Sequence, residues 1–357
     1  MMFHVKHRLF KTPYLALNLD VLEKNVRSLA DLAQKNGTVL RPHCKSHKTL
    51  EIAQLQMKEG AGGITASTLK EVRYLAQGGI PSVTLAYPLV DVQKLTEFLE
   101  LEKTMDLRTI VISKEHGRFL NDHVHSSSPL KVYLKVDTGL GRLGVVVEEI
   151  QETLAHLKTL PHLKIIGLLT HGGQSYKGEV EMAVYATQES GGLLEHRRSD
   201  LLISCGSTPT IRPLLKVQGV DEGRPGNYVF YDRTMLSLGV CSLEDCSLTI
   251  RTTVLSVNPN RLVVDAGSKA LSSDGGVHGN QTLKGYGLVL EGVDLLVERL
   301  SEEHGIITGK DLDRFSPGDI LNILPNHACS AVNLYDEMAV FKEGLYLTDY
   351  IIRGRGH

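Results

Sequence analysis

Short apolar runs alternate with amphipathic stretches over the first two thirds of the chain. The apolar runs have the length of buried strands, and between most of them apolar residues recur every three or four positions, as on one face of a helix. Leu22, Val26 and Leu29 form such a stripe. Repeated strand-then-helix units predict parallel strands with right-handed crossovers. The expected strands are Tyr14–Leu19, Val39–Ser46, Gly63–Ala66, Val83–Tyr87, Thr109–Ser113, Leu130–Asp137, Lys164–Thr170 and Leu202–Ser204.

About eight units of this kind close a barrel. The predicted fold class is therefore α/β, with a (β/α)8 TIM-like barrel. Segment 178–200 has a helical pattern whose ends are unclear. The other expected helices are Leu22–Gln34, Glu51–Glu59, Leu69–Gln77, Val90–Leu99 and Glu148–Leu157.

The pattern changes near Cys241. From there the chain has short alternating runs, such as SLTIRTTVLSV, RLVVDAG, GYGLVLEG and DILNILPNHAC, with Gly, Pro and Asn between them. Such runs predict strands and turns. A barrel over residues 12–240 followed by a β-rich domain over residues 241–357 agrees with usual domain sizes.

Composition excludes several classes of protein. Lys and Arg number 39 against 41 Asp and Glu, so the net charge of -2 gives no reason to expect nucleic acid or a membrane surface as partner. Five scattered cysteines do not suggest a disulfide framework. No apolar run is long enough to cross a bilayer, and the N-terminus lacks the apolar core of a signal peptide. We therefore expect a cytoplasmic enzyme with a small-molecule substrate.

The segment RPHCKSHK, at the end of the second expected strand, carries a lysine among basic residues. In an extended strand, Arg41, His43, Lys45 and His47 would share one face. Active sites of barrels gather at the carboxyl ends of the strands. Positive neighbours lower the pKa of a lysine and favour the free amine that a Schiff base needs. The residues alone fit a reactive lysine and a solvated basic turn equally well.

His327 and Cys329 stand two positions apart in PNHAC. In extended backbone both side chains would point to one face and could bind one ion, and imidazole with thiolate suits Zn²⁺. Without further support, a buried cysteine beside a histidine is more often structural. Glu302, Glu303 and His304 either supply an acid or base near this metal or form a solvated turn.

Seven motifs occur in an order that resembles one family. They are TPYLALNLDVLEKNV, RPHCKSHK, VDTGLGRLG, GLLTHGGQSY, SCGSTPT, EGRPGNYVFYD and LPNHAC. Together they resemble the fold-type III pyridoxal-phosphate (PLP) enzymes, in particular the D-threonine aldolase and eukaryotic-type D-serine dehydratase family. The resemblance covers about residues 12–350. It implies an alanine-racemase-like, PLP-binding barrel and a D-serine-dehydratase-like second domain that carries a metal site.

The resemblance implies roles for residues of the barrel. Lys45 matches the Schiff-base lysine, Arg142 lies near the cofactor ring, and Tyr176 lies beside the cofactor. His43 is a further candidate catalytic residue because it accompanies Lys45. The phosphate group is expected at Gly206, Ser207, Thr208, Gly226 and Asn227, with Arg224 near the pyridine nitrogen.

At the metal position, the resemblance makes His327 and Cys329 the ligands of a divalent ion. The thiolate favours zinc, with manganese or magnesium as alternatives. The expected function is a lyase for β-hydroxy-D-amino acids, of the D-serine dehydratase type. Alternatives are a D-threonine aldolase, an amino-acid racemase and a non-catalytic PLP-binding protein. Relatives are commonly homodimers, so we expect a homodimer here.

Overall fold

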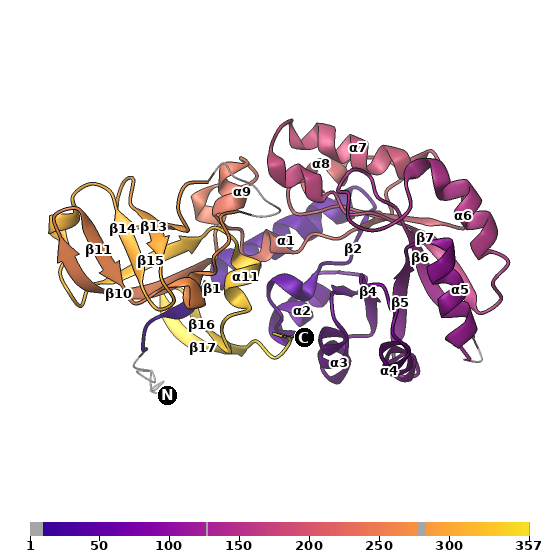
Figure 1. Cartoon of the computed structure of the whole chain (residues 1–357), viewed down its shortest axis with the longest axis horizontal. Helices are drawn as coiled ribbons and strands as arrows, with labels where there is room; N and C mark the ends of the chain where they lie inside the picture. The colour runs from indigo at the N-terminus through magenta and orange to yellow at the C-terminus, as the bar shows by residue number, and fades with distance from the viewer. Residues whose placement is uncertain (1–9, 126–127, 277–282, 357) are drawn as a thin grey trace.

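The computed structural model describes residues 10–125, 128–276 and 283–356. Two parts are visible in Figure 1, a ring of parallel strands surrounded by helices and an antiparallel sheet beside it. The described chain begins just before the first strand of this antiparallel sheet and ends just after its last strand. Near that end, Gly354 N donates a hydrogen bond to Lys48 O of the first part.

The first part is an eight-stranded parallel sheet, in the order β2-β9-β8-β7-β6-β5-β4-β3. An isolated bridge between His43 and Thr65, with hydrogen bonds from Gly62 N to Leu40 O and from Thr65 N to Pro42 O, joins β2 to β3. The ring of strands is thereby closed into a barrel. Its strands are β2 (Val39–Leu40), β3 (Ile64–Ala66), β4 (Ser82–Leu85), β5 (Asp106–Val111), β6 (Leu130–Lys135), β7 (Leu163–Leu169), β8 (Leu202–Cys205) and β9 (Glu222–Gly223).

Amphipathic helices cover the outside of the barrel. The α1 helix begins after Asn18, whose side chain accepts a hydrogen bond from Val21 N, and it buries Leu22, Val26 and Leu29 as the stripe predicts. The helices around the barrel are α1 (Leu19–Lys35), α2 (Leu50–Lys58), α3 (Leu69–Gln77), α4 (Val92–Glu102), α5 (Lys114–His123), α6 (Ile150–Leu157), α7 (Met182–Leu194) and α8 (Ile211–Leu214).

The second part is a nine-stranded sheet in the order β11-β14-β13-β12-β15-β10-β1-β16-β17. An additional pairing of β10 with β11 closes the strands from β10 to β15 into a smaller ring. The strands are β1 (Tyr14–Asn18), β10 (Leu248–Asn258), β11 (Arg261–Val264), β12 (Gly287–Val289), β13 (Leu296–Leu300), β14 (Gly305–Thr308), β15 (Ile320–Pro325), β16 (Glu337–Lys342) and β17 (Leu345–Ile351). Three short helices accompany them: α9 (Arg233–Ser237), α10 (Ser268–Leu271) and α11 (Ala328–Val332).

The first expected barrel strand is not part of the barrel. The strand β1 pairs antiparallel with β10 and parallel with β16, so the start of the chain belongs to the second sheet. The eighth barrel strand is instead β9, of only two residues, which the sequence pattern did not reveal. An apolar run followed by a helix looks the same in the sequence whichever sheet the run joins.

A polar group fills the inside of the barrel. Arg41 Nε lies 3.1 Å from Glu222 Oε1, and Tyr133 donates a hydrogen bond of 2.7 Å to Glu222 Oε2. Arg108 also pairs with Glu222 at 3.3 Å. Arg41 is therefore buried inside the barrel rather than beside Lys45, contrary to the alternation expected of an extended strand. Among the described residues, no helix combines the length and apolar character needed to cross a membrane.

Candidate active site

A cavity of about 590 Å³ lies between the mouth of the barrel and the second sheet. Its size is typical of small-molecule sites. Residues of both parts form its wall: His43, Lys45, Ser46, Lys48, His171, Tyr176, Ser207, Thr208, Arg224, Gly226 and Asn227 from the barrel side, and Ser268, Ser272, Ser273, Asp274, His327, Cys329, Ser330, Asn333 and Leu334 from the other. Ten of the twelve residues expected at the site are among them.

Lys45 lies on a single 3₁₀ turn, Cys44–Ser46, that follows β2. The expected strand over 39–46 ends at Leu40, and His43 caps the turn by accepting a hydrogen bond of 3.4 Å from Lys45 N. No hydrogen bond or ion pair joins Lys45 Nζ to another described residue. Burial lowers the pKa of Lys45, and Arg142 and Arg224 lower it further, whereas the Cys329 thiolate and the Glu71 carboxylate act to raise it. The amine is thus available as a nucleophile.

His43 and His47 differ in position although both were expected beside Lys45. The ring of His43 lines the cavity, and burial, then the charges of Lys45 and Arg224, hold its pKa well below 6.5. The imidazole beside Lys45 is therefore neutral and adds no positive charge to the site. His47 is fully buried beneath the turn, where its Nδ1 accepts a hydrogen bond from Thr49 N, and burial lowers its pKa to about 3.

Tyr176 and Arg142 occupy different parts of the site. Tyr176, on the 3₁₀ segment Gly173–Lys177, is buried in the cavity wall, and burial raises its pKa. Arg142 lies outside this cavity and lines a neighbouring one of about 220 Å³, together with Lys45, Lys135 and Arg224. Its glycine-rich loop is held by Asp137, whose carboxylate accepts hydrogen bonds from the backbone of residues 139, 141 and 142.

The loop after β8 presents two hydroxyl groups to the cavity. Ser207 and Thr208 line it, but Gly206 does not, because its N–H donates a hydrogen bond of 2.7 Å to Glu189. The same carboxylate of Glu189, on α7, accepts a hydrogen bond of 2.9 Å from Gly172 N. One buried residue thus joins the loop that carries Tyr176 to the loop that carries Ser207. The sequence did not suggest a role for Glu189.

Arg224, Gly226 and Asn227 also line the cavity, and Gly226 N donates a hydrogen bond of 3.3 Å to Thr208 Oγ1. The guanidinium group of Arg224 donates hydrogen bonds to Thr170 O and to Ser204 Oγ, which fixes its orientation. Gly226 leaves no room for a side chain, since a Cβ there would lie 2.8 Å from Ser46 Oγ. This close approach brings the loop after β9 against the turn that carries Lys45.

Asp232 connects the barrel side of the cavity to the second sheet. It accepts hydrogen bonds of 2.6 Å from Asn227 Nδ2 and of 3.0 Å from Ala328 N, the first residue of α11. Its carboxylate also caps α9 by accepting from Met235 N. Asp232 is the last residue of the motif EGRPGNYVFYD, and no pattern in the sequence indicates that it bridges the two halves of the site.

His327 and Cys329 reach the same cavity, although only His327 has the extended backbone that was expected of both. His327 precedes α11, and Cys329 lies in its first turn. Cys329 Sγ is 3.1 Å from Ser46 Oγ, next to Lys45. Burial acts to lower the pKa of His327, but the Cys329 thiolate and Asp274 outweigh it and raise the pKa to about 10. Burial acts to raise the pKa of Cys329, and His327 outweighs it and lowers the pKa.

Asp274 was not expected at the site. Its Oδ2 lies 2.7 Å from His327 Nδ1, and it accepts a hydrogen bond of 2.5 Å from Ser330 Oγ. A carboxylate on one ring nitrogen leaves the other nitrogen of the imidazole for an ion, as in many metal sites. The only signal in the sequence is an acidic residue in the glycine- and serine-rich segment SSDGG.

Glu302, Glu303 and His304 are not in the cavity wall. The two glutamates are exposed and pair with Lys269 at 3.1 and 2.7 Å. The interpretation as a solvated turn is therefore the one that agrees with the structure.

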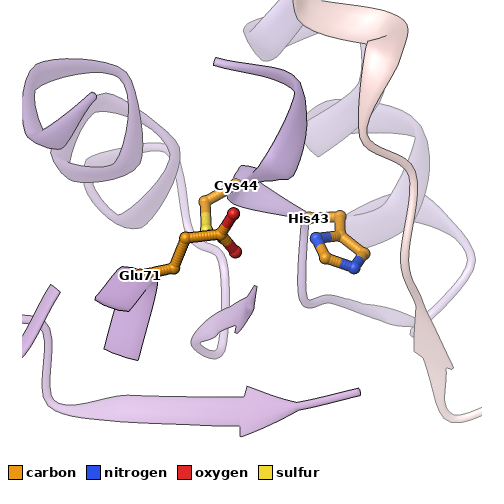
Figure 2. A group of neighbouring side chains, drawn as sticks. All are labelled: His43, Cys44 and Glu71. Carbon is orange, nitrogen blue, oxygen red and sulfur yellow. The ribbon is translucent and has the colours of Figure 1, made fainter. Parts of the chain in front are cut away.

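His43, Cys44 and Glu71 form a further group of possible metal ligands, whose ligand atoms lie within 4.8 Å of one another. Figure 2 shows Cys44 and Glu71 facing each other, with the ring of His43 to one side. Burial, then Glu71, holds the pKa of Cys44 well above its usual value, so the sulfur stays a thiol. The Glu71 carboxylate already accepts from Ser67 N and pairs with Lys48. These contacts argue against a metal ion in this position.

Two known families match the chain in succession. Residues 17–234 match the family described as alanine racemase, N-terminal domain, and residues 247–341 match a putative serine dehydratase domain. The chain is 32% identical over 346 residues to D-threo-3-hydroxyaspartate dehydratase from Delftia sp. (strain HT23), covering 89% of this chain and 91% of that protein. It is 28% identical to D-serine dehydratase from Dictyostelium discoideum, with 92% and 93% covered.

Solved structures of these relatives have the same fold over nearly the whole chain. The Delftia dehydratase has a TM-score of 0.90 at 29% identity, with 98% of both chains covered. A cysteine-to-alanine variant of a D-threo-3-hydroxyaspartate dehydratase, in the metal-free form, has the same TM-score at 28% identity, with 98% of both chains covered. A more distant sequence relative is D-threonine aldolase from Arthrobacter sp., 25% identical over 97% of this chain and 93% of that protein. The chain therefore belongs to the family of fold-type III pyridoxal-phosphate lyases with an alanine racemase-like barrel, which includes D-serine dehydratases and D-threonine aldolases.

Proposed function

We propose that this chain is a PLP- and divalent-metal-dependent lyase that eliminates water from a small β-hydroxy-D-amino acid, with D-serine as the preferred class of substrate. The observation that carries this proposal is a single contact between the two parts of the molecule. Ser46, next to Lys45, is hydrogen-bonded to Cys329 at 3.1 Å. The reactive amine and the imidazole–thiolate pair therefore face one cavity.

The donor set of the cavity fits pyridoxal phosphate. It contains the Lys45 amine, the hydroxyls of Ser207 and Thr208, and the guanidinium group of Arg224. An aldehyde needs an amine, and a phosphate needs hydroxyl and N–H donors. When bound there, the cofactor supplies an electron sink for charge that develops at the α-carbon of an amino acid.

The donor set also fits a divalent ion. His327 and Cys329 would hold it, and Asp274 would orient the imidazole through Nδ1. Thiolate and imidazole ligands favour zinc over manganese or magnesium. An ion with open positions supplies a Lewis acid for a hydroxyl group. In the Delftia dehydratase, the cysteine of the metal-free variant stands two positions after a histidine that was also replaced by alanine, which is the spacing of His327 and Cys329.

The residues of this chain would then have separate roles in the reaction. Lys45 would use its Nζ to hold the cofactor and to take a proton from the α-carbon of the substrate. His43, which is neutral and adjacent, would add no positive charge beside Lys45. Tyr176 and Arg224 would fix the cofactor, and Ser207, Thr208, Gly226 and Asn227 would surround its phosphate group. Gly206 would act by shaping the loop, and Arg142 would act from the neighbouring cavity.

Two reactions fit the geometry of this site. Removal of the α-proton leads to loss of the β-hydroxyl, and D-serine gives pyruvate and ammonia. Removal of the hydroxyl proton leads to cleavage between the α- and β-carbons, and D-threonine gives glycine and acetaldehyde. The two relatives with the higher identities, 32% and 28%, are dehydratases, which supports elimination. The D-threonine aldolase of Arthrobacter sp., at 25% identity, supports cleavage as the second candidate.

Product analysis separates these reactions. The purified protein, supplied with PLP and zinc or manganese, is incubated with D-serine, D-threonine and D-threo-3-hydroxyaspartate. Elimination yields ammonia and a 2-oxo acid, and cleavage yields glycine and an aldehyde. Release of glycine without ammonia would replace the dehydratase proposal by the aldolase. Formation of the L-enantiomer alone would overturn both. The cytoplasmic location and the homodimer remain predictions.

A further inference from the structure

Two lysines line the cavity from the same short segment, three residues apart. Lys45 Nζ has no ionic partner among the described residues, whereas Lys48 Nζ lies 3.3 Å from Glu71 Oε1. The side chains of Lys48 and Glu71 are 10% and 1% exposed. An ion pair that is shielded from water in this way is much stronger than one on the surface. The covalent bond to the cofactor needs one amine, and the described residues of the cavity wall offer two.

The Glu71 carboxylate is held in place from several sides. It belongs to the first turn of α3, and its Oε2 accepts a hydrogen bond of 2.6 Å from Ser67 N. Cys44 Sγ donates to the same oxygen at 3.4 Å, and Figure 2 shows these two side chains facing each other. Glu71 thus contacts the residues on both sides of Lys45, at positions 44 and 48, but not Lys45 itself.

The backbone of Lys48 is equally constrained. Its φ of 54° is in the left-handed region, which residues other than glycine rarely adopt. Lys48 N donates a hydrogen bond of 2.7 Å to Cys44 O, and Lys48 O accepts one of 3.1 Å from Gly354 N. With its backbone fixed by these bonds, the side chain of Lys48 is directed toward Glu71 at the edge of the cavity.

We propose that Glu71 is a positioning residue that assigns the cofactor to Lys45 by keeping Lys48 in an ion pair. The inference rests on the proposed binding of pyridoxal phosphate. In the covalent step, the nitrogen lone pair of an amine forms a bond to the aldehyde carbon, the carbonyl oxygen leaves as water, and a double bond to nitrogen results. An ammonium group bound to a carboxylate offers no lone pair. Lys45 therefore reacts and Lys48 does not.

The location of the bond can be measured directly. The full chain is loaded with pyridoxal phosphate and treated with borohydride, which makes the link to lysine permanent, and peptide mass spectrometry finds the labelled residue. Wild type should carry the label on Lys45. In Glu71→Gln, the share of label on Lys48 should rise on the order of tenfold, because a shielded ion pair has been broken. Label that stays on Lys45 alone in Glu71→Gln would overturn the inference.

Cys44→Ser is the matched control. It removes the thiol contact of Glu71 but leaves the Lys48–Glu71 pair, so the label should stay on Lys45. A turn that is merely loosened would lose total label without transferring it to Lys48, and that result in Glu71→Gln would also contradict the proposal. If Glu71→Gln does not fold, Glu71→Asp shortens the carboxylate by one methylene, and it should transfer a smaller share of the label.

The same test can be made in Lys45→Ala, where the amine of Lys45 no longer competes with that of Lys48 for the cofactor. In Lys45→Ala, Lys48 should remain unlabelled, and in Lys45→Ala/Glu71→Gln it should become labelled. Equal labelling of Lys48 in the two proteins would overturn the role of Glu71. Absence of label from Lys45 in wild type would instead overturn the proposed function, so the two failures can be told apart.

Discussion

At the scale of single residues, burial and nearby charges decide what each side chain of the cavity can do. Burial lowers the pKa of Lys45, and burial and neighbouring cations lower that of His43. Both groups therefore tend toward their neutral forms. On the other wall, the interaction of His327 with Cys329 favours a charged imidazole and a thiolate. The barrel side of the cavity thus offers a neutral amine and a neutral imidazole, whereas the other side carries a charged imidazole and a thiolate.

Replacement of Lys45 tests the attachment of the cofactor. Lys45→Ala should abolish the visible absorbance of lysine-bound pyridoxal phosphate, because the remaining lysine of the cavity is paired with Glu71. The absorbance spectrum of the purified protein measures this. Lys103→Ala, at an exposed position far from the cavity, should leave the spectrum as in wild type. An unchanged spectrum in Lys45→Ala would remove the assignment.

The pH dependence of cofactor uptake follows from the pKa of Lys45. Because the folded protein lowers this pKa below 10.5, more of the amine is neutral at a given pH than in an ordinary lysine. Uptake of pyridoxal phosphate by the apoprotein should therefore quicken as pH rises and level off below pH 10.5. Stopped-flow absorbance follows the rate. A rate that continues to rise beyond that pH would mean that the amine is not perturbed.

Asp274 should control the affinity for metal. Asp274→Asn keeps the size of the side chain but removes the charge next to His327 Nδ1. Loss of such a partner typically weakens metal binding by about 10- to 100-fold. Competition with a chromophoric chelator gives the dissociation constant. Asp319→Asn, an exposed residue that accepts from Ser316 N, is the control and should bind metal normally.

At the scale of elements, the sequence located the segments that carry the site better than it described their conformation. Lys45 was expected on a strand, but Pro42 and the histidine cap at His43 favour a 3₁₀ turn. His327 and Cys329 were expected in extended backbone, and a short helix brings Cys329 into the cavity. Local patterns cannot foresee such turns, because contacts between the two halves of the molecule, as at Asp232, help to stabilise them.

Asp232 should couple the stability of α11 to that of the loop after β9. Asp232→Asn would weaken the bonds to Asn227 and Ala328 inside the protein. Disturbing a buried, charged hydrogen-bond group of this kind costs about 1–3 kcal/mol. Urea unfolding should show this loss, together with weaker binding of both cofactor and metal. Asp31→Asn, at an exposed position of α1, should cost less than about 1 kcal/mol. Equal losses in the two variants would contradict the bridging role.

At the scale of the whole molecule, alternation of strands and helices was sufficient to predict the barrel and the β-rich domain. It could not reveal that β1 crosses to the second sheet or that β9 completes the ring, because strand partners depend on long-range contacts. Ten of the twelve residues expected from the resemblance line one cavity. Glu189 and Asp232 were found through their hydrogen bonds, and Asp274 through its place in the cavity wall and its contact with His327. The site itself exists only when both parts of the chain are together.

The central claim is that one cavity joins the amine of Lys45 to a metal ion at His327 and Cys329 for a single elimination reaction. It is tested most directly by measuring ammonia release from D-serine against the amount of metal bound per chain. Activity should fall to zero as a chelator removes the ion, return with zinc, and be absent in Cys329→Ala while the lysine-bound absorbance persists. Ammonia release that continues after the metal has been removed completely would contradict the account.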